Sequence, residues 1–160
     1  MILITVGSSI FPFFRMTTLV AQLAHTIQRH EPIIFQYGHA APDFLDRHTK
    51  AHAFLPHATL LSHIRRARLI ICHGGPATIY EALSFGKIPW VLPREQRYGE
   101  HLNNHQVDFA YFMAGHRLIH RITPHTPVTA IYGTRTNIAP IRKTDTRLIG
   151  YLTGIIEKTL

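Results

Sequence analysis

Residues 69–86 read LIICHGGPATIYEALSFG and place two kinds of local structure in one short stretch. The first four residues form an apolar, β-branched run that is typical of a buried strand. Pro76 suits the first position of a helix, because its missing N–H would have no partner there. The residues that follow favour a helix as far as Gly86, a residue that commonly ends one. The stretch therefore predicts a strand, a tight turn at His73, Gly74 and Gly75, and a helix.

The same alternation continues in both directions along the chain. Apolar runs predict strands at residues 2–6, 33–36, 51–55, 69–72, 88–92 and 117–119. Apolar residues at helical spacing predict helices over residues 16–28, 57–67, 76–85 and 101–114. Because the strands are short, apolar and separated by helices, we expect an α/β, Rossmann-like parallel sheet of about six strands with helices on both faces.

The length and composition of the chain fit a single domain, residues 1–160. Its 160 residues are 46% apolar, which is enough for one core. Residues 123–143 are rich in Thr, Pro and Gly and predict an irregular segment, and residues 145–157 predict a closing helix. No apolar run approaches the roughly 20 residues that cross a bilayer, so we expect a soluble, cytoplasmic chain. The single cysteine, Cys72, lies in a predicted strand and is expected to be buried and inert.

The charge of the chain favours anionic partners. Seventeen Lys and Arg residues against nine Asp and Glu give a net charge of +8. Such a surface attracts nucleic acid, phosphorylated ligands or an acidic membrane face, and charge alone does not choose among them. The basic residues are spread along the chain without a nucleic-acid-binding motif. Nucleic acid is therefore the weaker alternative.

Four turns that each follow a predicted strand carry the unusual residues. Carboxyl ends of parallel strands meet at one edge of the sheet, where ligands bind in folds of this type. Each turn alone is ordinary, but four together favour a binding site. They are Gly7-Ser8-Ser9, Gly38-His39, His73-Gly74-Gly75 and Pro93-Arg94.

The turn before Pro76 is suited to a phosphate. Gly74 and Gly75 leave the start of the following helix uncovered, so that its N–H groups and dipole can face an anion. Thr78 and Glu81 lie three residues apart and share a helix face. Glu81 can accept hydrogen bonds from the two hydroxyls of a ribose, although an ordinary exposed glutamate fits the spacing equally well.

Two common nucleotide motifs are absent. The first turn is not G-x-G-x-x-G, and no acidic residue follows the second predicted strand, which argues against a dehydrogenase. The sequence also has no G-x-x-x-x-G-K-[ST], which excludes a P-loop phosphotransferase.

The stretch PREQRYGEHLNNHQ at residues 93–106 is rich in hydrogen-bonding groups. On the helix predicted to begin at His101, it and Asn104, His105 and Asp108 form a polar stripe at i, i+3, i+4 and i+7. Two histidines at i and i+4 can bind zinc, but Leu102 stands where zinc proteases have Glu, and no third ligand is evident. We expect no metal. The stripe fits a polyhydroxylated ligand or a solvated helix face.

Four segments together resemble a known family. These are HGGPATIYEALSFGKIPWVLPR, YGEHLNNHQ, the N-terminal MILITVGSSIFPF and FQYGH at residues 35–39. They resemble the donor-binding half of inverting glycosyltransferases of the GT-B fold over residues 1 to about 120. The resemblance is strongest to short members that form one chain of a two-chain enzyme, such as the dolichol-linked N-acetylglucosaminyltransferase and split bacterial exopolysaccharide transferases.

This resemblance implies a catalytic or donor-binding subunit that moves a sugar from a UDP-sugar to a lipid-linked saccharide. It implies a membrane-anchored partner subunit that supplies the N-terminal-type half, a heterodimer located peripherally at the inner face of the membrane, and no cofactor or metal. The D-x-D element of metal-dependent transferases is absent. The sugar stays open among N-acetylglucosamine, galactose, glucose and glucuronic acid. A non-catalytic UDP-sugar-binding or regulatory subunit is the alternative.

The resemblance also implies roles for individual residues. Gly74, Gly75 and the helix N-terminus at Pro76 would face the diphosphate, with His73 beside it. Glu81 would bind the ribose, Thr78 belongs to the same UDP-sugar site, and Arg94 would lie near the uracil or diphosphate. Glu100, His101 and Asn104 would meet the sugar, while Gly7, Ser8 and Ser9 would face the cleft that the partner closes. His39, on the same edge, belongs to the expected UDP-sugar site, and His39 and His101 are the candidates for the general base. The catalytic residue is otherwise unknown.

Overall fold

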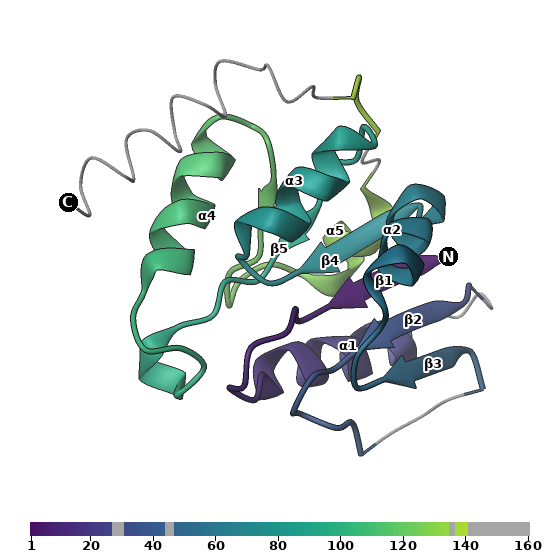
Figure 1. Ribbon diagram of the computed structural model, residues 1–160, viewed down its shortest axis with the longest axis horizontal. Helices are drawn as coiled ribbons and strands as arrows, with labels where there is room; N and C mark the ends of the chain where they lie inside the picture. Colours follow the sequence, from purple (N-terminus) through teal and green to yellow (C-terminus); the bar gives the residue numbers. More distant parts are fainter. Residues whose placement is uncertain (27–30, 44–46, 135–136, 141–160) are drawn as a thin grey trace.

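The computed structural model describes residues 1–26, 31–43, 47–134 and 137–140. Its centre is a six-stranded sheet in which every pair of neighbouring strands is parallel (Figure 1). The strand order is β3-β2-β1-β4-β5-β6. The strands are β1 (Ile2–Thr5), β2 (Ile33–Gln36), β3 (Thr49–His52), β4 (Leu69–Cys72), β5 (Trp90–Val91) and β6 (His120–Arg121).

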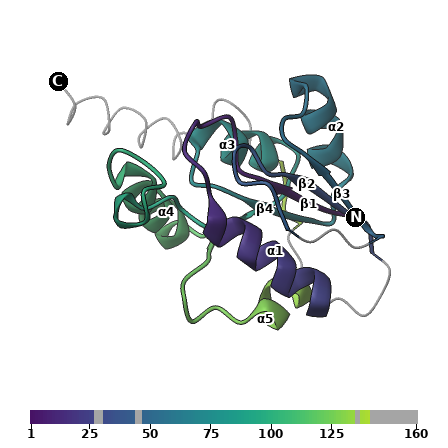
Figure 2. The same cartoon turned by 90° about the horizontal axis from the view of Figure 1, so that it is seen from below.

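Helices cover both faces of the sheet, as Figure 2 shows. One face carries α1 (Phe14–Thr26) and α5 (Val128–Gly133). The other carries α2 (His57–Arg66), α3 (Pro76–Ser84) and α4 (His105–Gly115). A short 3-10 helix, η1 (Gln96–Tyr98), lies in the loop between β5 and α4. The predicted α/β class, with helices on both faces, is confirmed.

The core divides between the two faces as the alternation of side chains along a strand requires. In β1, Ile2 and Ile4 belong to the cluster that includes Met16 and Val20 of α1. Leu3, between them, belongs to the cluster with α2 and α3 residues on the opposite face. The central strands are buried on both sides, which is why their sequences are continuously apolar.

Several predicted boundaries were wrong. The third strand lies at Thr49–His52 rather than 51–55, and the sixth at His120–Arg121 rather than 117–119. The segment predicted as irregular contains α5, and its residue Asn137 forms a β-bridge with Lys87. The closing helix predicted over 145–157 lies outside the described residues. No helix in the part of the chain that the structure describes is long and apolar enough to cross a membrane.

The strand order places a topological switch point between β1 and β4. From β1 the chain builds outward through β2 and β3, and it then returns to place β4 on the other side of β1. Ligands of doubly wound sheets bind in the crevice at such a point, beyond the carboxyl ends of the strands. Here the two adjoining ends lead into Gly7 and His73. We call the edge formed by the carboxyl ends of the strands the carboxyl edge.

Candidate functional site

The four turns predicted to share one edge do so, because they follow four parallel strands, β1, β2, β4 and β5, that are adjacent in the sheet. A hydrogen bond of 2.8 Å from Gln36 Nε2, at the end of β2, to the carbonyl oxygen of Gly7 joins β2 to the first turn. Ser8 is exposed at the edge, and Ser9 Oγ accepts a hydrogen bond from the N–H of Phe11. The prediction of a common edge is confirmed.

The ring of His73 fills the space between two glycines. A Cβ atom on Gly75 would come within 2.2 Å of His73 Nε2, and one on Gly7 would come within 2.5 Å of Cε1. Gly7 also has φ +72°, a conformation that few other residues adopt. Both glycines are therefore required by the imidazole itself.

His73 is a neutral imidazole at physiological pH. Burial, together with the nearby charge of Arg94, lowers its pKa to about 4. Its Nδ1 atom is buried and has no hydrogen-bond partner in the described part of the chain. The ring therefore presents a neutral polar group, rather than a cation, at the switch point.

The requirement for glycine at position 74 is explained by Gln106, a residue that sequence reasoning missed. The side-chain oxygen of Gln106, on α4, accepts hydrogen bonds from the N–H of Gly74 at 3.1 Å and from the N–H of Arg94 at 3.2 Å. A Cβ on Gly74 would lie 2.9 Å from Gln106 Cβ. The Gly74 N–H is thus used inside the protein. The signal in the sequence was a polar residue that shares the buried helix face with Phe109 and Met113.

Helix α3 begins at the carboxyl edge without a cap. Gly75 is its N-cap, Pro76 is its first residue, and no described side chain bonds to its first turn. An uncapped first turn leaves N–H donors and the positive end of the helix dipole available to an anion. Pro76 and Ala77 are exposed, so this helix end is open to a ligand.

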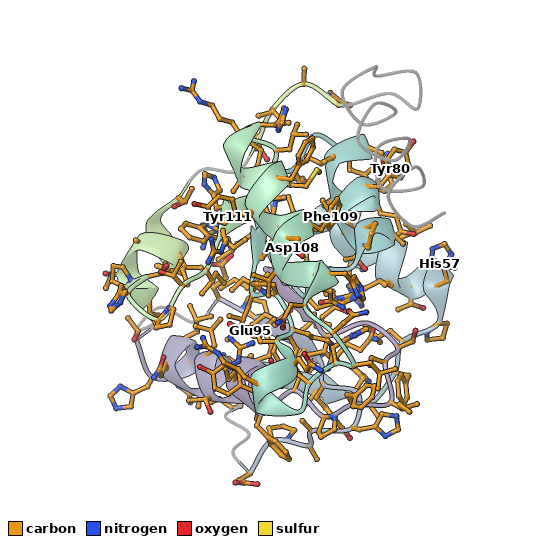
Figure 3. The ribbon with its side chains drawn as sticks, turned by 90° about the vertical axis from the view of Figure 1, so that its left-hand side faces the viewer. His57, Tyr80, Glu95, Asp108, Phe109 and Tyr111 are labelled. Atoms are coloured by element: carbon orange, nitrogen blue, oxygen red, sulfur yellow. The ribbon has the colours of Figure 1, made fainter. Side chains whose placement is uncertain are left out.

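Thr78 and Glu81 differ in accessibility although they are one turn apart. Thr78 is buried, whereas the side chain of Glu81 is 21% exposed. Glu81 Oε1 lies 2.7 Å from Nε2 of His57, the first residue of α2. His57 projects from the edge of the molecule in Figure 3. Sequence reasoning did not include it among the site residues.

Arg94 is buried, and both terminal nitrogens of its guanidinium donate to backbone oxygens, while Nε has no hydrogen-bond partner in the described part of the chain. Its guanidinium donates to the carbonyls of Val6 at 3.0 Å, Phe11 at 2.9 Å and Glu100 at 3.2 Å. Burial lowers its pKa to about 10, so it stays protonated at neutral pH. The positive charge of Arg94 therefore lies inside the protein, behind the carboxyl edge. This geometry supports a role at a distance rather than the expected direct contact of the guanidinium with uracil or diphosphate.

Glu100, expected to meet the sugar, is also committed within the protein. Its buried carboxylate binds the guanidinium of Arg15, with 2.9 Å between Nε and Oε1 and a second contact to Oε2. It also accepts the N–H of Glu95 at 3.0 Å. Arg15 further donates to the carbonyl of Pro93 at 2.8 Å. Arg15 therefore ties the loop at residues 93–100 to α1, a role that sequence reasoning missed.

The polar stripe predicted from residue 101 was wrong in its helical geometry, because α4 begins only at His105. Asn104 holds the preceding chain in a bend by accepting the N–H of Gln96 at 2.9 Å through Oδ1. His101 lies in this bend, with its ring centroid 4.5 Å from that of His105. Figure 3 shows Asp108 and Phe109 on α4, where Phe109 lies on the side toward α3.

His39 and His101, the two candidates for the general base, differ in the hydrogen-bonding groups that their rings present. Nδ1 of His101 accepts the N–H of Leu102 at 3.0 Å, which leaves the proton of the neutral ring on Nε2. Burial, followed by His105 and Arg94, lowers the His101 pKa. His101 thus presents a donor to the edge. His39 is exposed, with its ring centroid 5.4 Å from that of Phe54.

The family described as "Glycosyltransferase family 28 C-terminal domain" matches residues 1–128. The chain belongs to this family. The resemblance seen in the sequence is confirmed: the chain is a C-terminal, donor-binding domain of the GT-B type of glycosyltransferase. A search among curated proteins finds no match.

Two solved structures share the fold of the family 28 domain. A structure titled as the glycotransferase of kitacinnamycin has a TM-score of 0.62 and 19% identity, covering 96% of this chain and 37% of its own. The glycosyltransferase SnogD from Streptomyces nogalater has a TM-score of 0.54 and 18% identity, covering 76% of this chain and 30% of its own. The chain thus spans about a third of the length of these proteins.

The chemistry available to the family 28 domain at the switch point is that of anion binding. It consists of the open N-terminus of α3, the neutral ring of His73 and the buried charge of Arg94. Among the residues that the structure describes, no three His, Cys, Asp or Glu side chains are grouped to hold a metal ion. The ligand contacts of all these residues stay predictions.

Proposed function

We propose that this chain is the donor-binding, catalytic subunit of an inverting, metal-independent glycosyltransferase that moves a sugar from a UDP-sugar to a lipid-linked saccharide. The observation that carries the proposal is the uncapped N-terminus of α3 at the switch point, beside His73. Sugar transfer itself follows from the family. The uridine donor, the lipid-linked acceptor and the role in polysaccharide or glycan biosynthesis are the proposed part.

The mechanism follows from the charge that develops on the donor. Breaking the bond between sugar and UDP builds negative charge on the diphosphate. Fixed dipoles and cations stabilise such charge without having to reorganise. In this proposal the first turn of α3 binds the diphosphate directly. The buried guanidinium of Arg94 adds the attraction of its positive charge from inside the protein, behind the carboxyl edge.

The acceptor hydroxyl also needs a general base. Within this chain His39 is the better candidate, because it is exposed at the carboxyl edge and no described residue holds its ring nitrogens. His101 offers a donor instead, through Nε2. Its predicted role among the sugar contacts is therefore better supported than a role as the base.

A partner subunit that closes the cleft is supported by exposed apolar side chains around the polar site. Five of them, each 48% to 75% exposed, lie in segments at the carboxyl edge: Ile10, Phe14, Phe54, Tyr98 and Leu102. Apolar side chains gathered on one surface indicate an interaction site. The two solved structures contain much additional chain. We propose that a membrane-anchored partner covers these five apolar side chains and locates the enzyme at the inner face of the membrane.

The experiment that tests the proposal is calorimetry of the purified chain with UDP and with UDP-linked N-acetylglucosamine, galactose, glucose and glucuronic acid, using ADP and CDP as controls. We expect UDP to bind and the controls to bind more weakly. Absence of UDP binding at millimolar concentration, both alone and in membranes that contain the co-expressed partner, would overturn the proposal. Binding without transfer in those membranes would instead identify a non-catalytic UDP-sugar-binding subunit.

A further inference from the structure

A side-chain hydrogen bond joins two neighbouring helices on the carboxyl edge. Nε2 of His57, the first residue of α2, lies 2.7 Å from Oε1 of Glu81, in the second turn of α3. The two helices pack on the same side of the sheet, where Ile64 of α2 and Ala82 of α3 share one core cluster. The contact therefore connects two elements whose relative position is fixed by the core.

Stability gives little reason for this contact. The side chain of His57 is 69% exposed and that of Glu81 is 21% exposed. Exposed pairs of this kind contribute only about 0 to 1 kcal/mol to folding. Pro56, with φ −55°, fixes the backbone just before His57 at the start of α2. The arrangement orients a carboxylate more than it stabilises the fold.

The contact with His57 uses one oxygen of the Glu81 carboxylate and leaves the other oxygen available to a ligand. Oε1 faces His57, while Oε2 has no hydrogen bond to any residue that the structure describes. A carboxylate has several acceptor positions on each oxygen, and a vicinal diol has two O–H donors. A carboxylate that is held on one side can meet such a diol in one orientation, without first losing rotational freedom.

We infer that His57 is a positioning residue, which holds the Glu81 carboxylate so that it accepts hydrogen bonds from the 2′- and 3′-hydroxyls of the donor ribose. This inference rests on the proposed function, in which Glu81 binds the ribose. Because the carboxylate has an acceptor for each hydroxyl, His57 would act on the discrimination between ribonucleotides and 2′-deoxyribonucleotides. It would not act on the diphosphate, which in the proposed function binds at the first turn of α3, before the turn that carries Glu81.

The test is the ratio of affinities for UDP and 2′-deoxy-UDP, measured by calorimetry. For the wild-type chain we expect UDP to bind about tenfold more tightly, the effect of one hydrogen bond to a charged group. In His57→Ala the ratio should fall several-fold, because UDP has two hydroxyls that depend on the orientation of Glu81 and 2′-deoxy-UDP has one, so UDP loses more affinity. His57→Gln, whose amide can still donate, should restore part of the ratio.

Two further variants separate the possible failures. Glu81→Ala should remove the discrimination, and His57→Ala should then have no further effect in that background. His25→Ala, an exposed histidine at the end of α1, is the matched control and should leave the ratio unchanged. Thermal unfolding of every variant checks that the fold is intact.

The outcomes distinguish this inference from the function on which it rests. If the wild-type chain does not discriminate and Glu81→Ala changes nothing, the ribose site of the proposed function is wrong. If the wild-type chain discriminates through Glu81 and His57→Ala keeps the full ratio, the role of His57 is wrong. Equal losses for both nucleotides in His57→Ala would also overturn that role.

Discussion

The imidazole of His73 lies against the backbone of Gly75, where a Cβ atom would come within 2.2 Å of Nε2. The backbone of Gly75, with φ −77° and ψ 126°, is one that alanine readily adopts. The requirement for glycine is therefore steric, and it comes from a side chain of the protein. Gly74 faces Gln106 in the same way. The glycine pair thus serves the packing of the turn as well as the opening of α3.

Gly75→Ala should destabilise the chain by about 1 to 3 kcal/mol, the usual cost of overpacking. Because His73 is the obstacle, His73→Ala should relieve most of the additional loss when the two changes are combined. Urea unfolding of the two single variants and the double variant measures this coupling. Gly115→Ala is the control, since nothing lies within 4 Å of a Cβ there. Additive effects of the two changes would contradict the steric explanation.

Gln106→Met should cost about 1 to 3 kcal/mol, because it leaves the buried N–H groups of Gly74 and Arg94 without their acceptor. Methionine is close to glutamine in size, so the variant tests the acceptor rather than the volume. Gln22→Met, at an exposed position of α1, should change the free energy of unfolding by less than about 0.5 kcal/mol. Equal effects at the two positions would show that the Gln106 oxygen has no special role.

The folded chain should lose stability as the pH falls from about 6.5 toward 4, in part through His73. Its pKa is about 4 in the folded chain and 6.5 as the ordinary value. The unfolded chain therefore binds more protons between these values, and stability rises with pH across this window. The free energy of unfolding, measured in urea at several pH values, should vary less steeply in His73→Gln. An unchanged pH dependence in that variant would contradict the neutral state of His73.

Arg15→Ala should loosen the loop at residues 93–100, because Arg15 binds Glu100, Glu95 and the carbonyl of Pro93. The exposed Arg97 in this loop is a cleavage position for trypsin. We expect faster cleavage after Arg97 in Arg15→Ala and an intermediate rate in Arg15→Lys, since lysine cannot form the two-pronged contact. Arg65→Ala, on the exposed side of α2, should cleave at the wild-type rate. Wild-type protection in Arg15→Ala would show that other contacts hold the loop.

UDP affinity should be the same with EDTA and with added Mg²⁺. The proposed diphosphate site relies on the α3 N-terminus and the charge of Arg94, and the sequence lacks the D-x-D element. Calorimetry in the two buffers measures this directly. A strong increase in affinity with Mg²⁺ would contradict the metal-independent donor site.

The sequence was sufficient for the sheet and for the carboxyl edge, because buried parallel strands are continuously apolar and each is followed by a turn with small or polar residues. It was less informative about boundaries. The bend at residues 101–104 depends on the contact of the Asn104 side chain with the N–H of Gln96, and helical spacing does not reveal it.

Contacts between residues distant in the sequence account for what was missed at the site. Arg15 meets Glu100 across 85 positions, Gly74 meets Gln106 across 32, and His57 meets Glu81 across 24. No local pattern contains such pairs. Distant contacts also explain why two residues that look like ligand residues on a polar loop point into the protein: Glu100 binds Arg15, and the Arg94 guanidinium donates to the carbonyls of Val6 and Phe11.

The buried position of Arg94 also bears on how the chain behaves in salt. Mobile ions screen exposed charges strongly at physiological ionic strength, with a Debye length of about 8 Å, but they screen buried charges much less. At that ionic strength the exposed arginines and lysines attract an anion over only a short distance. Arg94, enclosed by the carbonyls of Val6, Phe11 and Glu100, keeps its attraction at the salt concentrations found in cells.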